Sequence, residues 1–188
     1  MILATIEKIV DRFCWFLVRT FPGRVREIEV EGDKYLLRFY LKHSSPRFPG
    51  LYLHHFYRGD QDRDLHNHPW TKSVSFILAG GYVEERLPEE EKGKPNYKVQ
   101  TRTVGPGTLN VIRSNDFHRV DLIGRSTWTL FTSGKKVKDW GFMLRDTGEY
   151  VDHQTYEKLS NKQVLTAAEK EEARQRVEEY HAMAAASE

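Results

Sequence analysis

The sequence contains almost no cysteine. Cys14 is the single cysteine in 188 residues, which excludes an internal disulfide framework and a cysteine-rich zinc knuckle. A chain without structural disulfides fits a reducing compartment, so we expect a cytoplasmic protein.

The sequence also lacks a long uninterrupted hydrophobic run. Its most apolar stretch, residues 1–21, is broken by Glu7, Lys8, Asp11 and Arg12, and no small-residue cleavage site follows it. This pattern predicts neither a signal peptide nor a membrane-spanning helix.

The sequence also has no large excess of positive or negative charge. The 29 basic and 27 acidic residues leave a formal net charge of +2, and the one marked run of like charge is Glu89–Glu91. Because no basic stripe stands out, the charges indicate neither a nucleic-acid partner nor a membrane partner. A chain of this length fits a single domain with a core of ordinary size, so we expect one site.

Short runs of β-branched and aromatic residues, separated by residues suited to turns, fill the middle of the chain. About eight such strands at this spacing predict an all-β sandwich or barrel between residues 25 and 146. The predicted strands are Ile28–Val30, Tyr35–Leu41, Leu51–Tyr57, Val74–Leu78, Tyr97–Val104, Thr108–Ile112, Phe117–Leu122 and Thr127–Thr132.

Helical patterns flank the barrel on both sides. A helix is predicted in residues 1–21, and a helical extension, charged and rich in alanine over residues 167–186, is predicted within residues 147–188. For the first helix we favour packing over the barrel, or a seam in a homodimer, over attachment to a membrane surface. Its apolar stripe consists of Ile2, Ile6, Ile9, Val10, Phe13, Phe16 and Leu17.

Three histidines form the most informative pattern. His66 and His68 are spaced as His-x-His, which on a strand places both imidazoles on one face, and His118 follows a polar turn at the start of another predicted strand. Neutral imidazoles suit Fe, Mn, Ni, Cu or Zn, and three protein ligands leave open positions of the kind that a catalytic metal needs. These residues predict one divalent transition-metal site.

The segment around His66 and His68 resembles the first motif of the cupin superfamily. In that motif a glycine precedes His-x-His, and a glutamate and a closing glycine follow. Here Gly59 comes one residue early, Gly80 matches the closing glycine, and Ser73 occupies the position where the family usually has a glutamate ligand. The departure at Ser73 favours a site of three histidines.

The family's second motif aligns Gly107 with its first glycine and His118 with its histidine. Arg113, Asn115 and Leu122 replace its proline, second glycine and asparagine. Asparagine tolerates a left-handed backbone, so we expect Asn115 to preserve the turn that aims His118 inward.

The resemblance covers residues 51–132 and extends to a subgroup of small phage and bacterial cupins with a His-x-His-Pro-Trp motif. It implies a cupin-type jelly-roll barrel with N- and C-terminal helices. Our leading interpretation is a metal-dependent enzyme acting on a small molecule, with Fe(II) and dioxygenase-like chemistry first and Mn, Ni or Zn as alternative metals. A metal-independent sugar-nucleotide epimerase or isomerase remains open, as does a non-catalytic cupin for small ligands or assembly.

Further residues near the histidines are candidates for the site. We expect Tyr82 or Glu84 to handle a proton or to position the substrate, and Glu84 to be a candidate fourth ligand. Trp70 is a candidate for an aromatic wall, and Arg58 and Arg113 are candidates for anchoring an anionic group. Two weaker candidates are His55, as a residue facing the site, and Asp64, as a carboxylate that orients a ligand histidine.

Overall fold

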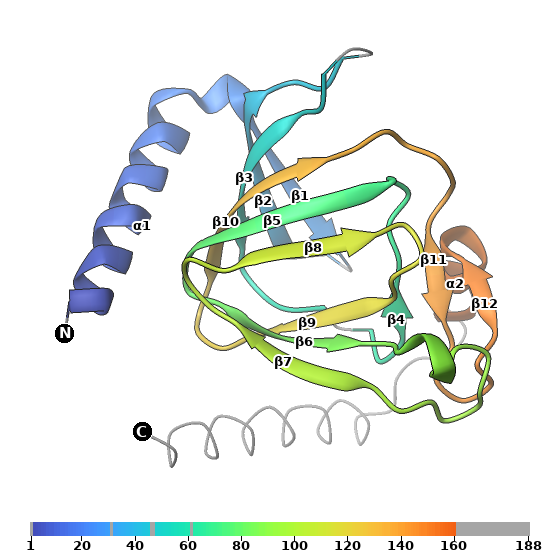
Figure 1. Cartoon of the computed structure of the whole chain (residues 1–188). Coiled ribbons are helices and arrows are strands. Elements are labelled where there is room, and N and C mark those ends of the chain that lie inside the picture. Colours follow the sequence, from blue (N-terminus) through green and yellow to red (C-terminus); the bar gives the residue numbers. More distant parts are fainter. Residues whose placement is uncertain (1, 31, 46–47, 61, 161–188) are drawn as a thin grey trace.

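The computed structural model describes residues 2–30, 32–45, 48–60 and 62–160. The predicted helix over residues 167–186 lies outside this range. Two six-stranded antiparallel sheets and two terminal helices make up the described chain, so the predicted all-β fold with terminal helices is confirmed (Figure 1).

The first sheet, called sheet A, has the strand order β1-β2-β3-β10-β5-β8. Six of the eight predicted strands belong to it, and all six are confirmed. Their bounds are β1 Val25–Val30, β2 Asp33–Lys42, β3 Leu51–Phe56, β5 Lys72–Ala79, β8 Leu109–Arg113 and β10 Thr127–Ser133.

The second sheet, called sheet B, has the strand order β12-β11-β4-β9-β6-β7. It holds the other two predicted strands, β7 and β9. Four strands of this sheet were not delimited from the sequence, namely β4, β6, β11 and β12, and three of them have only two or three residues. The bounds are β4 Leu65–His66, β6 Tyr82–Arg86, β7 Gln100–Val104, β9 His118–Leu122, β11 Gly141–Met143 and β12 Tyr150–Asp152.

The eight central strands form a jelly roll. Strands β3, β10, β5 and β8 lie together in sheet A, while β4, β9, β6 and β7 lie together in sheet B. The chain therefore crosses between the sheets at nearly every connection, which is the double Greek-key winding of this fold. Gly80 turns the chain from β5 to β6 with a φ of 76°, and a Cβ there would lie 2.3 Å from the carbonyl oxygen of Ser126.

Helix α1, Ile2–Thr20, packs on the outer face of sheet A and is followed by a 3₁₀ turn, Pro22–Arg24 (Figure 1). The helix buries Cys14 and Val18 against Leu53 and Trp128 of the sheet. No helix in the described part of the chain is long and apolar enough to cross a bilayer.

Only part of the apolar stripe predicted for α1 packs on the barrel, where Val10 and Leu17 contact the cluster that holds Cys14 and Val18. Ile6, Ile9, Phe13 and Phe16 are exposed by 49–62%, whereas Cys14 and Val18 are buried. The helix has more apolar residues than one buried face can hold, and the side that carries Cys14 and Val18 packs against Leu37, Leu53 and Trp128 of sheet A.

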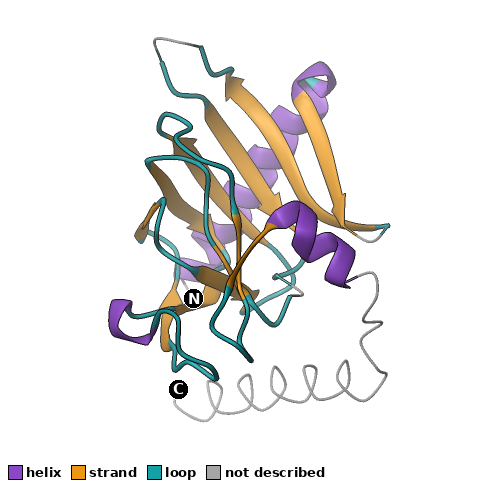
Figure 2. Ribbon diagram, turned by 90° about the vertical axis from the view of Figure 1, so that its right-hand side faces the viewer, coloured by secondary structure: helices purple, strands orange, loops and turns teal. Residues whose placement is uncertain are grey.

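Helix α2, His153–Ser160, lies on the side of the barrel opposite α1 (Figures 1 and 2). Strand β12 precedes it and pairs with β11, so sheet B continues beyond residue 146. The ring of Tyr156 stacks on Phe142 at 3.7 Å between centroids, which attaches the helix to the sheet. A second 3₁₀ turn, Glu89–Glu91, lies in the connection from β6 to β7.

Candidate metal centre

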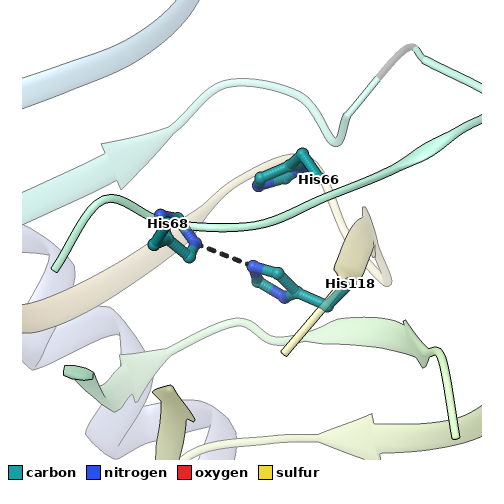
Figure 3. Close-up of side chains that lie close together, drawn as sticks. All are labelled: His66, His68 and His118. Atoms are coloured by element: carbon teal, nitrogen blue, oxygen red, sulfur yellow. Dashed lines mark hydrogen bonds between the residues drawn. The ribbon is translucent and has the colours of Figure 1, made fainter. Parts of the chain in front are cut away.

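The side chains of His66, His68 and His118 meet inside the barrel. Strand pairing places His66 of β4 directly opposite His118 of β9, and His68 lies two residues beyond His66. The three ring centroids are 4.8, 5.0 and 5.2 Å apart, and one ligand nitrogen from each ring lies within 4.8 Å of the other two. Figure 3 shows the rings facing a common point, with Nε2 of His68 2.8 Å from Nε2 of His118.

Burial keeps two of these imidazoles neutral. It lowers the pKa of His66 to about 4 and the pKa of His68 well below its ordinary value. A neutral imidazole has a nitrogen lone pair to offer a cation, whereas a protonated ring has none. At neutral pH both rings are therefore in the state that binds a metal.

Glu84 fixes the orientation of His118. The carboxylate is fully buried, and its Oε1 lies 2.9 Å from Nδ1 of His118. Burial by itself would raise the pKa of Glu84, but hydrogen bonds from His118 and Arg86 outweigh it and hold the pKa well below its usual value. An ionised carboxylate can only accept, so Nδ1 of His118 donates and its Nε2 keeps a lone pair toward the other histidines.

A polar network holds Glu84 in turn. Nε of Arg86 and Nε of Arg102 donate to Oε2 of Glu84 at 2.9 and 2.7 Å. Both arginines also donate to Oδ1 of Asn110, at 2.6 and 2.5 Å. The amide nitrogen of Asn110 donates to Oε1 of Glu84 at 3.0 Å and to the Tyr82 hydroxyl at 2.9 Å. The carboxylate is therefore balanced in charge and fixed in position.

Tyr82 and Glu84 share the inner face of β6, as the strand alternation predicts. Tyr82 is 3% exposed, and burial raises its pKa to about 12. Both oxygens of Glu84 are occupied by hydrogen bonds to the network and to His118. The structure thus places Glu84 behind His118 and joins Tyr82 to Glu84 through Asn110.

Asp60 approaches the cluster from the segment before β4. Its Oδ2 accepts from the backbone nitrogen of Val120 at 2.7 Å and lies 3.9 Å from Nδ1 of His66. Its Oδ1 accepts from the Tyr35 hydroxyl at 2.6 Å. Asp64, our candidate for this role, instead accepts from the backbone nitrogen of Arg145 and from the Tyr156 hydroxyl, so it anchors the C-terminal segment.

Aromatic rings surround the histidines. Trp70 stacks on His68 at 5.8 Å between centroids, and Trp140 and Phe142 lie 6.3 and 6.1 Å from His66. Trp70 thus lies where the sequence analysis expected an aromatic wall. These rings limit access of water and present apolar surface to any small molecule at the site.

Ser73, at the family's glutamate position, is fully buried on the inner face of β5. Among the described residues its Oγ has no hydrogen-bond partner, and neither has Oγ1 of the inward-facing Thr129. Buried hydroxyls without partners are rare in proteins, so both are polar groups still available to a bound molecule.

The other candidate residues lie elsewhere. Arg58 donates to the carbonyl oxygen of Val30 at 2.6 Å, next to the β1–β2 turn. Arg113 is exposed at the end of β8, and its backbone nitrogen donates to Asp116. His55 packs between Trp15 and Trp128 under α1, on the face of β3 that points away from the barrel interior.

The expectation for Asn115 is wrong. Among the described residues other than glycine, only Asn96 has a positive φ, at 53°. The turn before His118 is held instead by the side chain of Asp116, which accepts from the backbone nitrogen of Arg113, and by a backbone hydrogen bond from Asp116 to Arg113.

Sequence reasoning missed Asn110, Arg86, Arg102, Trp140 and Phe142. The alternation within Thr108–Ile112 could have marked Asn110 as an inward polar residue. The short strand β11 leaves too weak a pattern to place Trp140 and Phe142.

No protein-family model matches the chain, and no curated protein matches it in sequence. Among solved structures, it is similar to hydroxypropylphosphonic acid epoxidase from S. wedmorenis (TM-score 0.44, 11% identity, 60% of this chain and 56% of that one). It is also similar to oxalate oxidase in complex with glycolate (0.39, 18%, 50% and 45%) and to a variant of Streptomyces PAC13 with uridine (0.44, 9%, 67% and 90%). The chain spans about half the length of the epoxidase and the oxidase.

Proposed function

We propose that the protein is a metal-dependent enzyme that holds one divalent transition metal on His66, His68 and His118. The observation that carries this proposal is the convergence of three ring nitrogens within 4.8 Å inside a jelly roll. Fe(II) is our first choice of metal, followed by Mn, Ni or Zn, because imidazole ligands suit all four.

The donor set fits such an ion. The lowered pKa values of His66 and His68 keep their lone pairs available at neutral pH, and Glu84 directs Nε2 of His118 toward the same point. The Nε2 atoms of His68 and His118 lie 2.8 Å apart, which supports a common ligand position for the two rings. Three neutral ligands preserve the full charge of the ion and leave open positions.

The residues around the histidines have separate tasks in this proposal. Glu84 keeps the Nδ1 proton on His118, while Arg86, Arg102 and Asn110 hold Glu84, so we assign Glu84 a positioning role in place of a catalytic one. Trp70 provides apolar surface for a small substrate, and the unpartnered hydroxyl of Ser73 provides a polar contact. Bound Fe(II) would supply a centre at which dioxygen and a substrate can meet.

A second candidate function is a metal-independent isomerase or epimerase. The hydrogen bond between His118 and Glu84 favours it, because a buried carboxylate–histidine pair can transfer protons. The two candidates differ in one respect: isomerase activity survives a chelator, whereas the metal-dependent reaction stops and returns when metal is added back.

A spectroscopic experiment tests the metal centre and its open positions without knowledge of the substrate. The protein is loaded anaerobically with Co(II), and its visible absorption is recorded before and after the addition of azide. We expect a Co(II) spectrum that azide alters and that His118→Ala abolishes. A protein that takes up no Co(II), or a spectrum insensitive to azide, would contradict an open three-histidine centre.

If the open centre is found, oxygen uptake by the Fe(II)-loaded protein tests the reaction class. Pools of small organic acids, alcohols and amines are screened with a chelator-treated control. We expect at least one pool to accelerate uptake in the wild-type protein and not in His118→Ala. No acceleration by any pool would count against the dioxygenase-like assignment and leave the metal site intact.

A further inference from the structure

The outer face of α1 remains uncovered although it is strongly apolar. Ile6, Ile9, Phe13 and Phe16 are 49, 62, 58 and 62% exposed. At 3.6 residues per turn, these four side chains fall within about 80° of the helix circumference. They form one continuous strip, which we call the outer strip, on the side of the helix away from the residues that pack on sheet A.

The acidic residues and the basic residues of α1 lie on different sides of the helix. Asp11 accepts from Nε1 of Trp128 at 2.8 Å, and Glu7 accepts from the backbone nitrogen of Gly80 at 3.3 Å, so both acids face the barrel. Three basic residues, Lys8, Arg12 and Arg19, are exposed and follow one edge of the outer strip.

In the sequence, Glu7, Lys8, Asp11 and Arg12 interrupt an apolar segment. The structure shows that the acids are turned inward and that the exposed side combines large apolar residues with positive charge only. A helix of this kind lies in the plane of a membrane surface, with its apolar residues among the acyl chains and its basic residues at anionic headgroups.

A second copy of the chain fits this face less well. In an antiparallel pairing through the outer strip, Arg12 would approach the Arg12 of the other copy, and the exposed side of α1 offers no carboxylate to compensate. An anionic lipid surface provides both an apolar layer and negative charge.

We propose that the outer strip of α1 and its basic edge attach the protein to an anionic membrane surface, with the barrel outside the bilayer. The attachment is peripheral, and it does not depend on the metal site, which lies inside the barrel. It revises our expectation, drawn from the sequence, that the protein has no membrane partner.

Vesicle flotation of the full-length protein tests this proposal. Vesicles of phosphatidylcholine with phosphatidylserine are compared with vesicles of phosphatidylcholine alone, at low and high salt. We expect binding to the anionic vesicles that high salt weakens, because the exposed basic residues are screened. Phe13→Asp with Phe16→Asp should weaken binding more than about tenfold, through loss of buried apolar area and addition of negative charge.

Two further variants make the result specific. Charge reversal of Lys8, Arg12 and Arg19 to Glu should weaken binding more than about a hundredfold, since each basic residue near an anionic surface contributes about fivefold. The matched control is Val137→Asp, which changes an exposed apolar residue in the β10–β11 loop, across the barrel from α1, and should leave binding unchanged. Thermal melts confirm that each variant is folded.

Three results would overturn the proposal. These are equal binding to both vesicle types, binding that survives the α1 variants, and the absence of vesicle binding. If vesicles are not bound and light scattering shows a dimer that Phe13→Asp dissociates, a second copy covers the outer strip instead.

Discussion

The histidines of the barrel fall into two groups that share burial and differ in what their nitrogens face. His54 and His55 lie on β3, and burial lowers the pKa of both. Yet Nε2 of His54 accepts from Arg38 at 2.9 Å, and the ring of His55 is enclosed by Trp15 and Trp128. His66, His68 and His118 direct nitrogens at one another. A candidate metal site is therefore marked by ring nitrogens that converge on one another and by a carboxylate behind one of the rings. A lowered pKa alone does not mark such a site.

The largest expected effect is on the pH dependence of the free energy of unfolding, and histidines of both groups contribute to it. In metal-free protein, His55 and His66 have a pKa of about 4 when folded and an ordinary value of 6.5 when unfolded. Between these values the unfolded chain binds more protons, so the free energy of unfolding falls as the pH drops from 6.5 to 4. Each histidine contributes about 1.4 kcal/mol per unit of pKa shift. Urea denaturation at several pH values measures this; a flat profile would contradict the neutral buried rings.

Metal affinity separates the groups. We expect His118→Ala to weaken binding of Zn(II) more than about a hundredfold, since loss of a ligand exceeds the usual effect of losing its supporting partner. His54→Ala should leave the affinity within about twofold, because its ring bonds to Arg38. Isothermal titration calorimetry compares the two variants. Equal losses would mean that the two groups do not differ as described.

Glu84, the carboxylate behind His118, can be compared with its neighbour Glu85. Glu84→Gln should lower metal affinity about 10- to 100-fold, because the variant no longer fixes the proton on Nδ1 of His118. Glu85→Gln changes the next residue, which faces outward and accepts from Arg145 at 3.0 Å, and should leave the affinity unchanged. The same titration measures both. A Glu84→Gln protein with wild-type affinity and a wild-type Co(II) spectrum would remove the positioning role.

The smallest expected effect is on the free energy of unfolding, and it concerns the group of His54 and His55. Asp11 supports the environment of His55 by accepting from Trp128 at 2.8 Å. Asp11→Asn keeps an acceptor and loses its charge, so we expect a loss of about 1 kcal/mol in the free energy of unfolding. Urea denaturation at neutral pH measures it, and metal affinity should not change. A change in metal affinity would show that the two groups are coupled.

Much of the fold and the three histidines could be predicted from the sequence, for a physical reason. The longer alternating strands, such as β2, β5 and β10, leave a clear period of two, and His-x-His on a strand places both imidazoles on one face. The short strands β4, β11 and β12 leave no such period, so Trp140 and Phe142 could not be placed.

The position of Arg102 depended on a pairing that no local pattern records, because β6 pairs with β7 and places Arg102 opposite Glu84. Arg86 reaches Glu84 from two residues along the same strand, whereas Arg58, closer in sequence to His66, bonds to Val30. The direction of α1 was ambiguous for a related reason. Both sides of the helix are apolar, and only the contact with sheet A shows which one is buried.

The metal content of the protein decides whether His66, His68 and His118 hold a metal. Wild-type protein, His66→Ala and His54→Ala are reconstituted anaerobically with Fe(II), desalted and analysed by elemental mass spectrometry. We expect near-equimolar iron in the wild-type protein and in His54→Ala, and negligible iron in His66→Ala, with all three folded. No bound metal in the wild-type protein, or equal iron in His66→Ala, would contradict a metal centre on His66, His68 and His118.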